Sequence, residues 1–145
     1  MKAVPFAVAL TLVFATTGCK SNDSSTTSPS STTTAPAAAS PTTTEQWSGT
    51  LAVGTTRFYS FTVLQYGTVN MTVNSLTVGG AASDVTLSAG IGTPSGTTCA
   101  LTTSGTVQAG SQLTNTFDTG IRCVYIADPG TMSAPVAFTI AIDHP

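Results

Sequence analysis

The chain has 145 residues and a formal net charge of −2, and only 7% of its residues are charged. Because soluble domains usually carry about 25% charged residues, Gly, Ser and Thr must supply most of this surface. There is no basic field, which argues against a nucleic-acid partner. In residues 45–145 two arginines stand against five carboxylates, and the resulting −3 is too weak to indicate a cationic partner.

The chain begins with the pattern of an export signal. Lys2 precedes an apolar run at residues 3–15, which is too short for an ordinary transmembrane helix and typical of a signal peptide. Thr16-Thr17-Gly18-Cys19 follows, and small residues before a cysteine resemble the bacterial lipobox. This resemblance implies that residues 1–18 are removed. It also implies that Cys19 receives diacylglycerol and fatty acyl groups such as palmitate, which anchor the protein in a membrane.

Two residues around Cys19 qualify this interpretation. Thr16 stands where a lipobox usually has Leu, so the alternative is an ordinary secretory signal with a coincidental cysteine. In enteric lipoproteins an Asp after the cysteine retains the protein at the inner membrane. Here Lys20 occupies that position, so we expect an extracytoplasmic protein at the outer membrane or cell surface rather than at the inner membrane.

Residues 19–44 have the composition of a tether. Ser, Thr and Pro make up 18 of residues 20–44, and no aromatic or large aliphatic residue occurs there. Such a segment buries too little apolar area to offset its ordering entropy, so we predict that it is disordered. Fully stretched, it spans roughly 80 Å.

Residues 45–145 alternate apolar and polar residues in short runs. Tyr59, Phe61 and Val63 share one face of a strand, and Ser60 and Thr62 share the other. We predict strands at 47–51 (a short edge strand), 57–63, 68–76, 85–89, 98–101 and 113–117. The second and third of these form a hairpin, residues 90–96 are a turn, and residues 102–120 are largely irregular. Without a helical stripe, this spacing predicts an all-β antiparallel sandwich of the jelly-roll or immunoglobulin-like type.

The last quarter, residues 120–145, contains two more alternating runs joined by a Gly/Pro segment. We expect these runs to pair as two strands of one antiparallel sheet. Asp128-Pro129-Gly130 between them has the composition of a β-turn, with Asp at its first position and Pro at its second.

With Cys19 assigned to lipid, Cys99 and Cys123 remain as an even pair in an exported protein. We expect a disulfide that stabilises the domain by roughly 3–4 kcal/mol. The alternative is two buried free thiols. Two cysteines without a nearby histidine do not make a zinc site.

Residues 47–145 resemble the bacterial pre-peptidase C-terminal domain, a β-sandwich found in many exported proteins. The matching segments are Gly49-Thr50-Leu51, residues 58–63, 67–73, 120–128 and 138–142. Arg57 replaces an Asp of the family pattern, which puts any calcium-binding role of that Asp in doubt, and Arg122 replaces a Tyr. The resemblance implies a fold rather than a function, because the family's domain is an appendage to enzymes and does not itself make this chain a peptidase.

The sequence does not favour catalysis. His144 is the only histidine, and as the penultimate residue we expect it to be exposed and too loosely held for a Ser-His-Asp unit. Residues 92–96 resemble a nucleophile elbow, but Pro94 takes the place of the serine. A calcium site assembled from different loops stays an open alternative without a recognisable motif; its ligands would come from the scattered Asp84, Asp118, Asp128 and Asp143.

Four aromatic residues are candidates for a ligand platform: Trp47, Phe58, Tyr66 and Tyr125. The alternative is that these amphipathic rings pack over the edge of the core. Two hypotheses follow. The first is a non-enzymatic lipoprotein whose sandwich is a structural or interaction module for an extracytoplasmic protein. The second is a carbohydrate-binding module for cell-wall or other polysaccharide, and it requires these four aromatics to cluster in the open.

Overall fold

A computed structural model describes residues 42–145 of the chain. The predicted signal peptide, the predicted lipid-anchor residue Cys19 and most of the predicted tether lie outside these residues. All regular structure in the described part is strand. The strands are β1 (Thr43–Leu51), β2 (Thr56–Val63), β3 (Gly67–Val78), β4 (Ala81–Ala82), β5 (Leu87–Ser95), β6 (Thr98–Val107), β7 (Gln112–Phe117), β8 (Gly120–Ala127) and β9 (Val136–His144).

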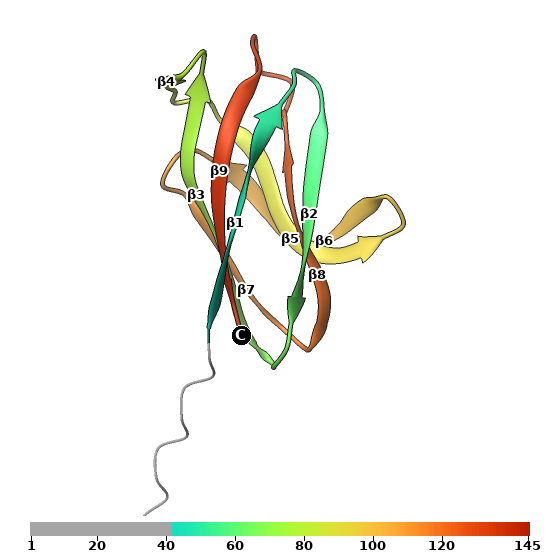
Figure 1. Cartoon of the computed structure of the whole chain (residues 1–145). Coiled ribbons are helices and arrows are strands. Elements are labelled where there is room, and N and C mark those ends of the chain that lie inside the picture. Colours follow the sequence, from blue (N-terminus) through green and yellow to red (C-terminus); the bar gives the residue numbers. More distant parts are fainter. Residues whose placement is uncertain (1–41) are drawn as a thin grey trace, which may run out of the picture. The chain divides into compact units, whose positions relative to one another are not determined.

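The strands form two antiparallel sheets packed face to face, which confirms the predicted β-sandwich (Figure 1). One sheet has the order β1-β9-β3, and both β4 and β7 pair with the remaining edge of β3. The other sheet has the order β2-β8-β5-β6. The predicted edge strand at 47–51 is confirmed as an edge, but β1 begins at Thr43 and so includes the last two residues assigned to the tether.

The core lies between the sheets and is built by the alternating side chains. In β3, Val69, Met71 and Val73 are buried while the residues between them are less buried or exposed. Phe61, Val124 and Ile126 face them from the opposite sheet. Burying one face of each sheet is what a period of two residues permits, and the Ser and Thr faces are left to water.

The predicted hairpin of residues 57–63 with 68–76 is wrong. β2 pairs with β8, and β3 pairs with β9 and β7, so the segment at Leu64–Tyr66 carries the chain from one sheet to the other. The predicted pairing within residues 120–145 is wrong for the same reason, because β8 and β9 belong to different sheets. Alternation indicates which side chains are buried, but it does not identify the neighbouring strand.

The predicted turn at residues 90–96 is wrong for residues 90–95, which continue β5 to Ser95, and only Gly96 of this range lies in the turn. β6 runs from Thr98 to Val107 rather than ending at Leu101. Figure 1 shows the tip of this β5–β6 hairpin extending past β2 and β8. The two glycines of β5, Gly90 and Gly92, are buried in the strand rather than placed in a turn. The strand predicted near 113–117 is confirmed as β7.

Candidate functional site

The β5–β6 hairpin changes its pairing where the chain crosses the outer face of its sheet. Its register shifts between Ile91 and Gly92, and Gly92 is also the last residue of β5 that pairs with β8. A Cβ atom at Gly92 would stand 2.0 Å from the carbonyl oxygen of Ala100, and one at Gly90 would stand 2.7 Å from that of Thr103. The two glycines therefore permit an approach of β6 to β5 that no side chain would allow.

A disulfide ties the tip of this hairpin to the sheet. Cys99 on β6 is bonded to Cys123 on β8, which confirms the predicted pair. Cys123 is fully buried and pairs across the sheet with Ser60 and Gly92. The bond thus joins the far end of the hairpin to the central strand beside it.

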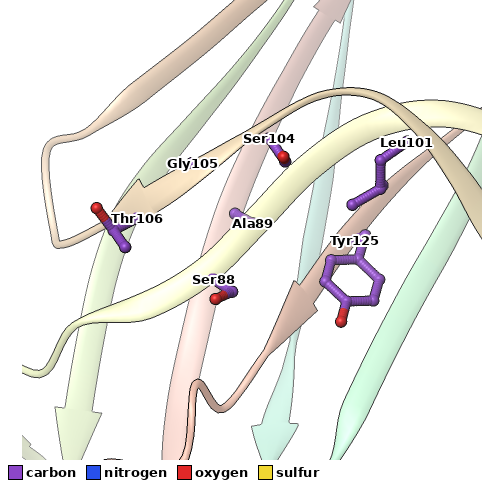
Figure 2. Close-up of a pocket in the computed structure, with 7 residues that line it drawn as sticks. All are labelled: Ser88, Ala89, Leu101, Ser104, Gly105, Thr106 and Tyr125. Carbon is purple, nitrogen blue, oxygen red and sulfur yellow. The ribbon is translucent and has the colours of Figure 1, made fainter.

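Two of the four candidate aromatics meet beneath the hairpin. Phe58 and Tyr125 are direct cross-strand neighbours on β2 and β8, on the side of the sheet away from the core. Leu101 of β6, which is 40% exposed, lies on the other side of Tyr125, and Figure 2 shows its side chain beside the ring. We call Phe58, Leu101 and Tyr125, with the residues that line the hollows around them, the Tyr125 face.

Two shallow hollows share Tyr125. One, of about 400 Å³, is lined by Thr56, Phe58, Thr97, Thr98, Cys99 and Tyr125. The other, of about 350 Å³, is lined by Ser88, Ala89, Leu101, Ser104, Gly105, Thr106 and Tyr125 (Figure 2). The linings consist of hydroxyl groups and apolar surface, and no carboxylate or basic side chain takes part. Such a surface can contact an uncharged ligand by ring stacking and hydroxyl hydrogen bonds.

The other two candidate aromatics lie elsewhere, so the predicted four-residue platform is not formed. Trp47 on β1 stacks on Tyr59 at a centroid distance of 5.9 Å and meets the edge of Phe138 at 4.8 Å. It packs against the core, as the alternative of edge packing predicted. Tyr66 lies in the β2–β3 segment and is 68% exposed.

His144 is buried, and the prediction of a solvated terminal side chain is wrong. It is 4% exposed, its ring lies 5.0 Å from that of Phe61, and its Nε2 lies 3.1 Å from Oε1 of Glu45. Glu45 also accepts a hydrogen bond from the hydroxyl of Tyr59, which raises the pKa of Tyr59, and burial and the negative charge of Glu45 add to this effect. A position next to the chain end gives no sequence signal for this burial. The burial follows from the strand register, because β9 pairs with β1 as far as His144.

Asp128 organises the segment after β8 through its side chain. Its Oδ1 accepts backbone N–H groups from Gly130, Thr131 and Met132 at 2.8–3.1 Å, and its Oδ2 accepts that of Gly54 at 2.8 Å. These bonds, led by the one from Gly54, lower the pKa of Asp128 despite partial burial. The predicted β-turn is thus a loop held by a carboxylate whose acceptor positions are taken.

No group of three or more His, Cys, Asp or Glu side chains within residues 42–145 is placed to hold a metal ion. The four aspartates that could have supplied a calcium site do not converge in this part of the chain. We therefore assign no metal ligands to Asp84, Asp118, Asp128 or Asp143 on the geometry.

The two arginines that depart from the pre-peptidase pattern bind backbone carbonyls. Arg57 donates from Nη1 to the carbonyl oxygen of Thr50 at 2.9 Å. Arg122 donates to the carbonyl of Asp118 and the hydroxyl of Thr93, both at 2.9 Å, and its guanidinium lies 5.2 Å from the centre of the Phe117 ring. Both side chains hold loops and neighbouring strands together.

Comparison of the chain with family models, with curated proteins and with solved structures found no match in any of the three. The resemblance to the pre-peptidase C-terminal domain stays a prediction from the segments quoted above. Within residues 42–145, the structure contains no helix of the length and apolar character needed to cross a membrane.

The hydroxyl and apolar lining of the Tyr125 face escaped sequence reasoning, apart from Phe58 and Tyr125. Leu101 was assigned to a short strand, and Ser104 and Thr106 fell in a segment that was expected to be irregular. One signal could have indicated them: Gly90 and Gly92 alternate with Ala89 and Ile91, which is the pattern of a strand whose outer face is covered closely.

Proposed function

We propose that this chain is a lipid-anchored extracytoplasmic protein whose β-sandwich is a non-catalytic interaction module. The main support for this proposal is the position of Cys19, which lies at the end of the apolar run and well before the first strand at Thr43. Acylation there would tether a domain that holds its own core. Lys20 after the cysteine supports the outer membrane or the cell surface as its location.

The use of the ionisable side chains in the sandwich supports a non-catalytic role. Glu45 is bound to Tyr59 and His144, and the Asp128 carboxylate to four backbone N–H groups. Arg57 and Arg122 are bound to carbonyl oxygens. General acid–base or nucleophilic catalysis needs such groups to face a substrate, whereas these groups join loops and strands.

The test of the anchor is labelling of the full-length protein with a palmitate analogue, followed by membrane fractionation. The wild-type chain should incorporate the label and sediment with membranes. The variant Cys19→Ser should lose the label and leave the membrane fraction. A Cys19→Ser chain that keeps both label and location would exclude this anchor.

Carbohydrate is the second candidate ligand, and the specific observation in its favour is the pairing of Phe58 with Tyr125 under a hydroxyl-bearing hairpin. Sugars present apolar C–H faces and many hydroxyls, which matches aromatic rings flanked by Ser and Thr. The absence of carboxylates and basic groups from both linings favours uncharged rather than acidic polysaccharide.

A glycan array, together with a pull-down on purified cell-wall polysaccharide, tests the sugar hypothesis. Binding should fall at least tenfold in Tyr125→Ala and stay within about twofold in Tyr66→Ala, since a tenfold loss corresponds to only about 1.4 kcal/mol of lost contact. Tyr66 is the matched control because it is an exposed tyrosine away from the hollows. No signal above background for the wild-type chain would dismiss carbohydrate and leave an extracytoplasmic protein as the ligand class.

A further inference from the structure

The most exposed large apolar side chains are gathered at one end of the sandwich. Leu64 is 72% exposed, Tyr66 68% and Ile121 59%, and every other large apolar residue of the described part is less exposed. Phe58 and Leu101 belong to the Tyr125 face, and Val53 lies in the loop between β1 and β2. Single exposed apolar residues are ordinary on a protein surface, but three together at one end require an explanation.

These three residues lie at the end that also carries the chain terminus. The backbone N–H of Leu64 donates to the carbonyl of Pro145 at 2.9 Å. A Cβ atom added at Gly67, next to Tyr66, would stand 2.8 Å from Cγ of Pro145, so the proline ring lies over this glycine. Ile121 pairs with Thr62, two residues before Leu64. We call Leu64, Tyr66 and Ile121 the Pro145 end.

The chain also enters the sandwich at the Pro145 end. β1 begins at Thr43, which pairs with His144, the residue before Pro145. Figure 1 shows the start of β1, the marked C-terminus and the β2–β3 segment at the same, lower end of the sandwich. Everything that precedes Thr43, including Cys19, is therefore attached at this end.

We propose that the Pro145 end rests on the lipid surface that holds the anchor. This inference depends on the proposed acylation of Cys19. The covalent chain limits the distance from Cys19 to Thr43 to roughly 80 Å, whatever its conformation. A tethered surface meets its partner at a high effective concentration, which lowers the affinity that the three apolar side chains must supply for contact.

The chemistry of the three side chains fits the interface of a bilayer. Tyrosine prefers the headgroup level, where its ring is half apolar and its hydroxyl is wet. Leu64 and Ile121 can enter the boundary between headgroups and acyl chains. Asp118 lies three residues before Ile121, and Asp143 pairs with Thr44 near the start of β1. These two carboxylates outnumber the one neighbouring cation, Arg122, and are repelled by anionic lipids, so the surface that suits this end is zwitterionic.

Bromolipid quenching of the mature, acylated protein in vesicles of phosphatidylcholine and phosphatidylethanolamine tests the contact. A tryptophan is placed at the Pro145 end in Tyr66→Trp, and at the opposite end in the control Val53→Trp. Trp47 provides the same background in both. We expect strong quenching above this background only in Tyr66→Trp, and a loss of at least half of it when Leu64→Ser and Ile121→Ser are added.

Equal quenching at positions 53 and 66, or none at 66, would overturn the proposal. Adding phosphatidylglycerol at low salt should weaken the quenching of Tyr66→Trp, and an increase would contradict the assignment to zwitterionic lipid. The proposed anchor and the proposed lipid contact can be disproved separately. Absence of the palmitate label from the wild-type chain would disprove the anchor. A labelled chain whose Tyr66→Trp stays unquenched keeps its anchor and lacks the contact.

Discussion

At the scale of single residues, polar side chains that are buried or fully hydrogen-bonded stabilise the ends and loops of the sandwich. Asp128 accepts four backbone N–H groups and joins the segment after β8 to the β1–β2 loop. His144 fills a buried site against Phe61 and bonds to Glu45. Its Nδ1 is buried without a hydrogen-bond partner in the described part of the chain, so Nε2 makes the ring's one hydrogen bond there.

The Asp128 contacts predict a pH-dependent effect of Asp128→Asn. Because folding lowers its pKa, the carboxylate stabilises the fold above its unfolded pKa of about 4, and this contribution disappears as the pH falls through the folded value. The asparagine has one acceptor oxygen where the carboxylate uses two. Urea unfolding should show a less stable variant at neutral pH and a smaller difference from wild type in acid. Asp84→Asn, at an exposed aspartate, is the control, and a difference that grows in acid would contradict this account.

The burial of His144 predicts that His144→Ala destabilises the domain. The change removes packing against Phe61 and leaves Glu45 without one partner, so we expect a loss of roughly 1–3 kcal/mol in the free energy of unfolding. Chemical denaturation of the wild type, the variant and the exposed-site control Ser48→Ala measures it. A loss no larger than that of the control would mean that the terminal residue is solvated after all.

At the scale of elements, the β5–β6 hairpin shapes the candidate binding face. Its path depends on two features that are distant in the chain: the glycines of β5, and the disulfide from β6 to β8. The first lets the strands cross closely, and the second holds the tip over the sheet beside Phe58 and Tyr125. A change in either feature should alter the shape of the hollows more than the structure of the opposite sheet.

Gly92→Ala tests the close approach. The added methyl group would lie 2.0 Å from the carbonyl oxygen of Ala100, a backbone atom that cannot rotate away. We expect a loss of about 1–3 kcal/mol or more in unfolding free energy. Gly105→Ala is the matched control in β6, because a Cβ atom added there would meet only a side-chain carbon of Leu113, at 3.5 Å. Equal stability of the two variants would contradict the crossing.

The double variant Cys99→Ala/Cys123→Ala tests the disulfide. Opening the loop should lower the free energy of unfolding by roughly 3–4 kcal/mol, mostly by freeing the unfolded chain. Amide hydrogen exchange should speed up most at the hairpin tip, residues 93–100, while the exchange rates of the β9 amides should change little. Uniform acceleration across both sheets would show that the bond does not act locally on the hairpin.

At the scale of the whole molecule, alternation was sufficient to predict the fold class but not the strand order. Tyr59, Phe61 and Val63 identify a half-buried strand wherever its partner lies. The partner of β2 is β8, far along the chain, and no local pattern specifies such a contact. Strands that follow each other in the chain do not pair at β2–β3 or at β8–β9, because each connection changes sheets.

The candidate site could be predicted only in part, because pairing between strands distant in the chain brings its residues together. Phe58 and Tyr125 were singled out as outward-facing aromatics, but only the long-range β2–β8 register makes them neighbours. Trp47 and Tyr66 share the aromatic character of this pair, but Trp47 belongs to a core edge and Tyr66 to the Pro145 end. The disulfide could be predicted without the register, because Cys99 and Cys123 are the two cysteines of residues 42–145 and the expectation of export favours their pairing.

The most direct measurement of the central claim is the mass of the mature amino terminus, taken on protein extracted from membranes of the native host. The account predicts a chain that begins at Cys19 and carries diacylglycerol, with a further acyl chain where the host adds one. A mature chain that retains residues 1–18, or that starts elsewhere with an unmodified Cys19, would contradict it.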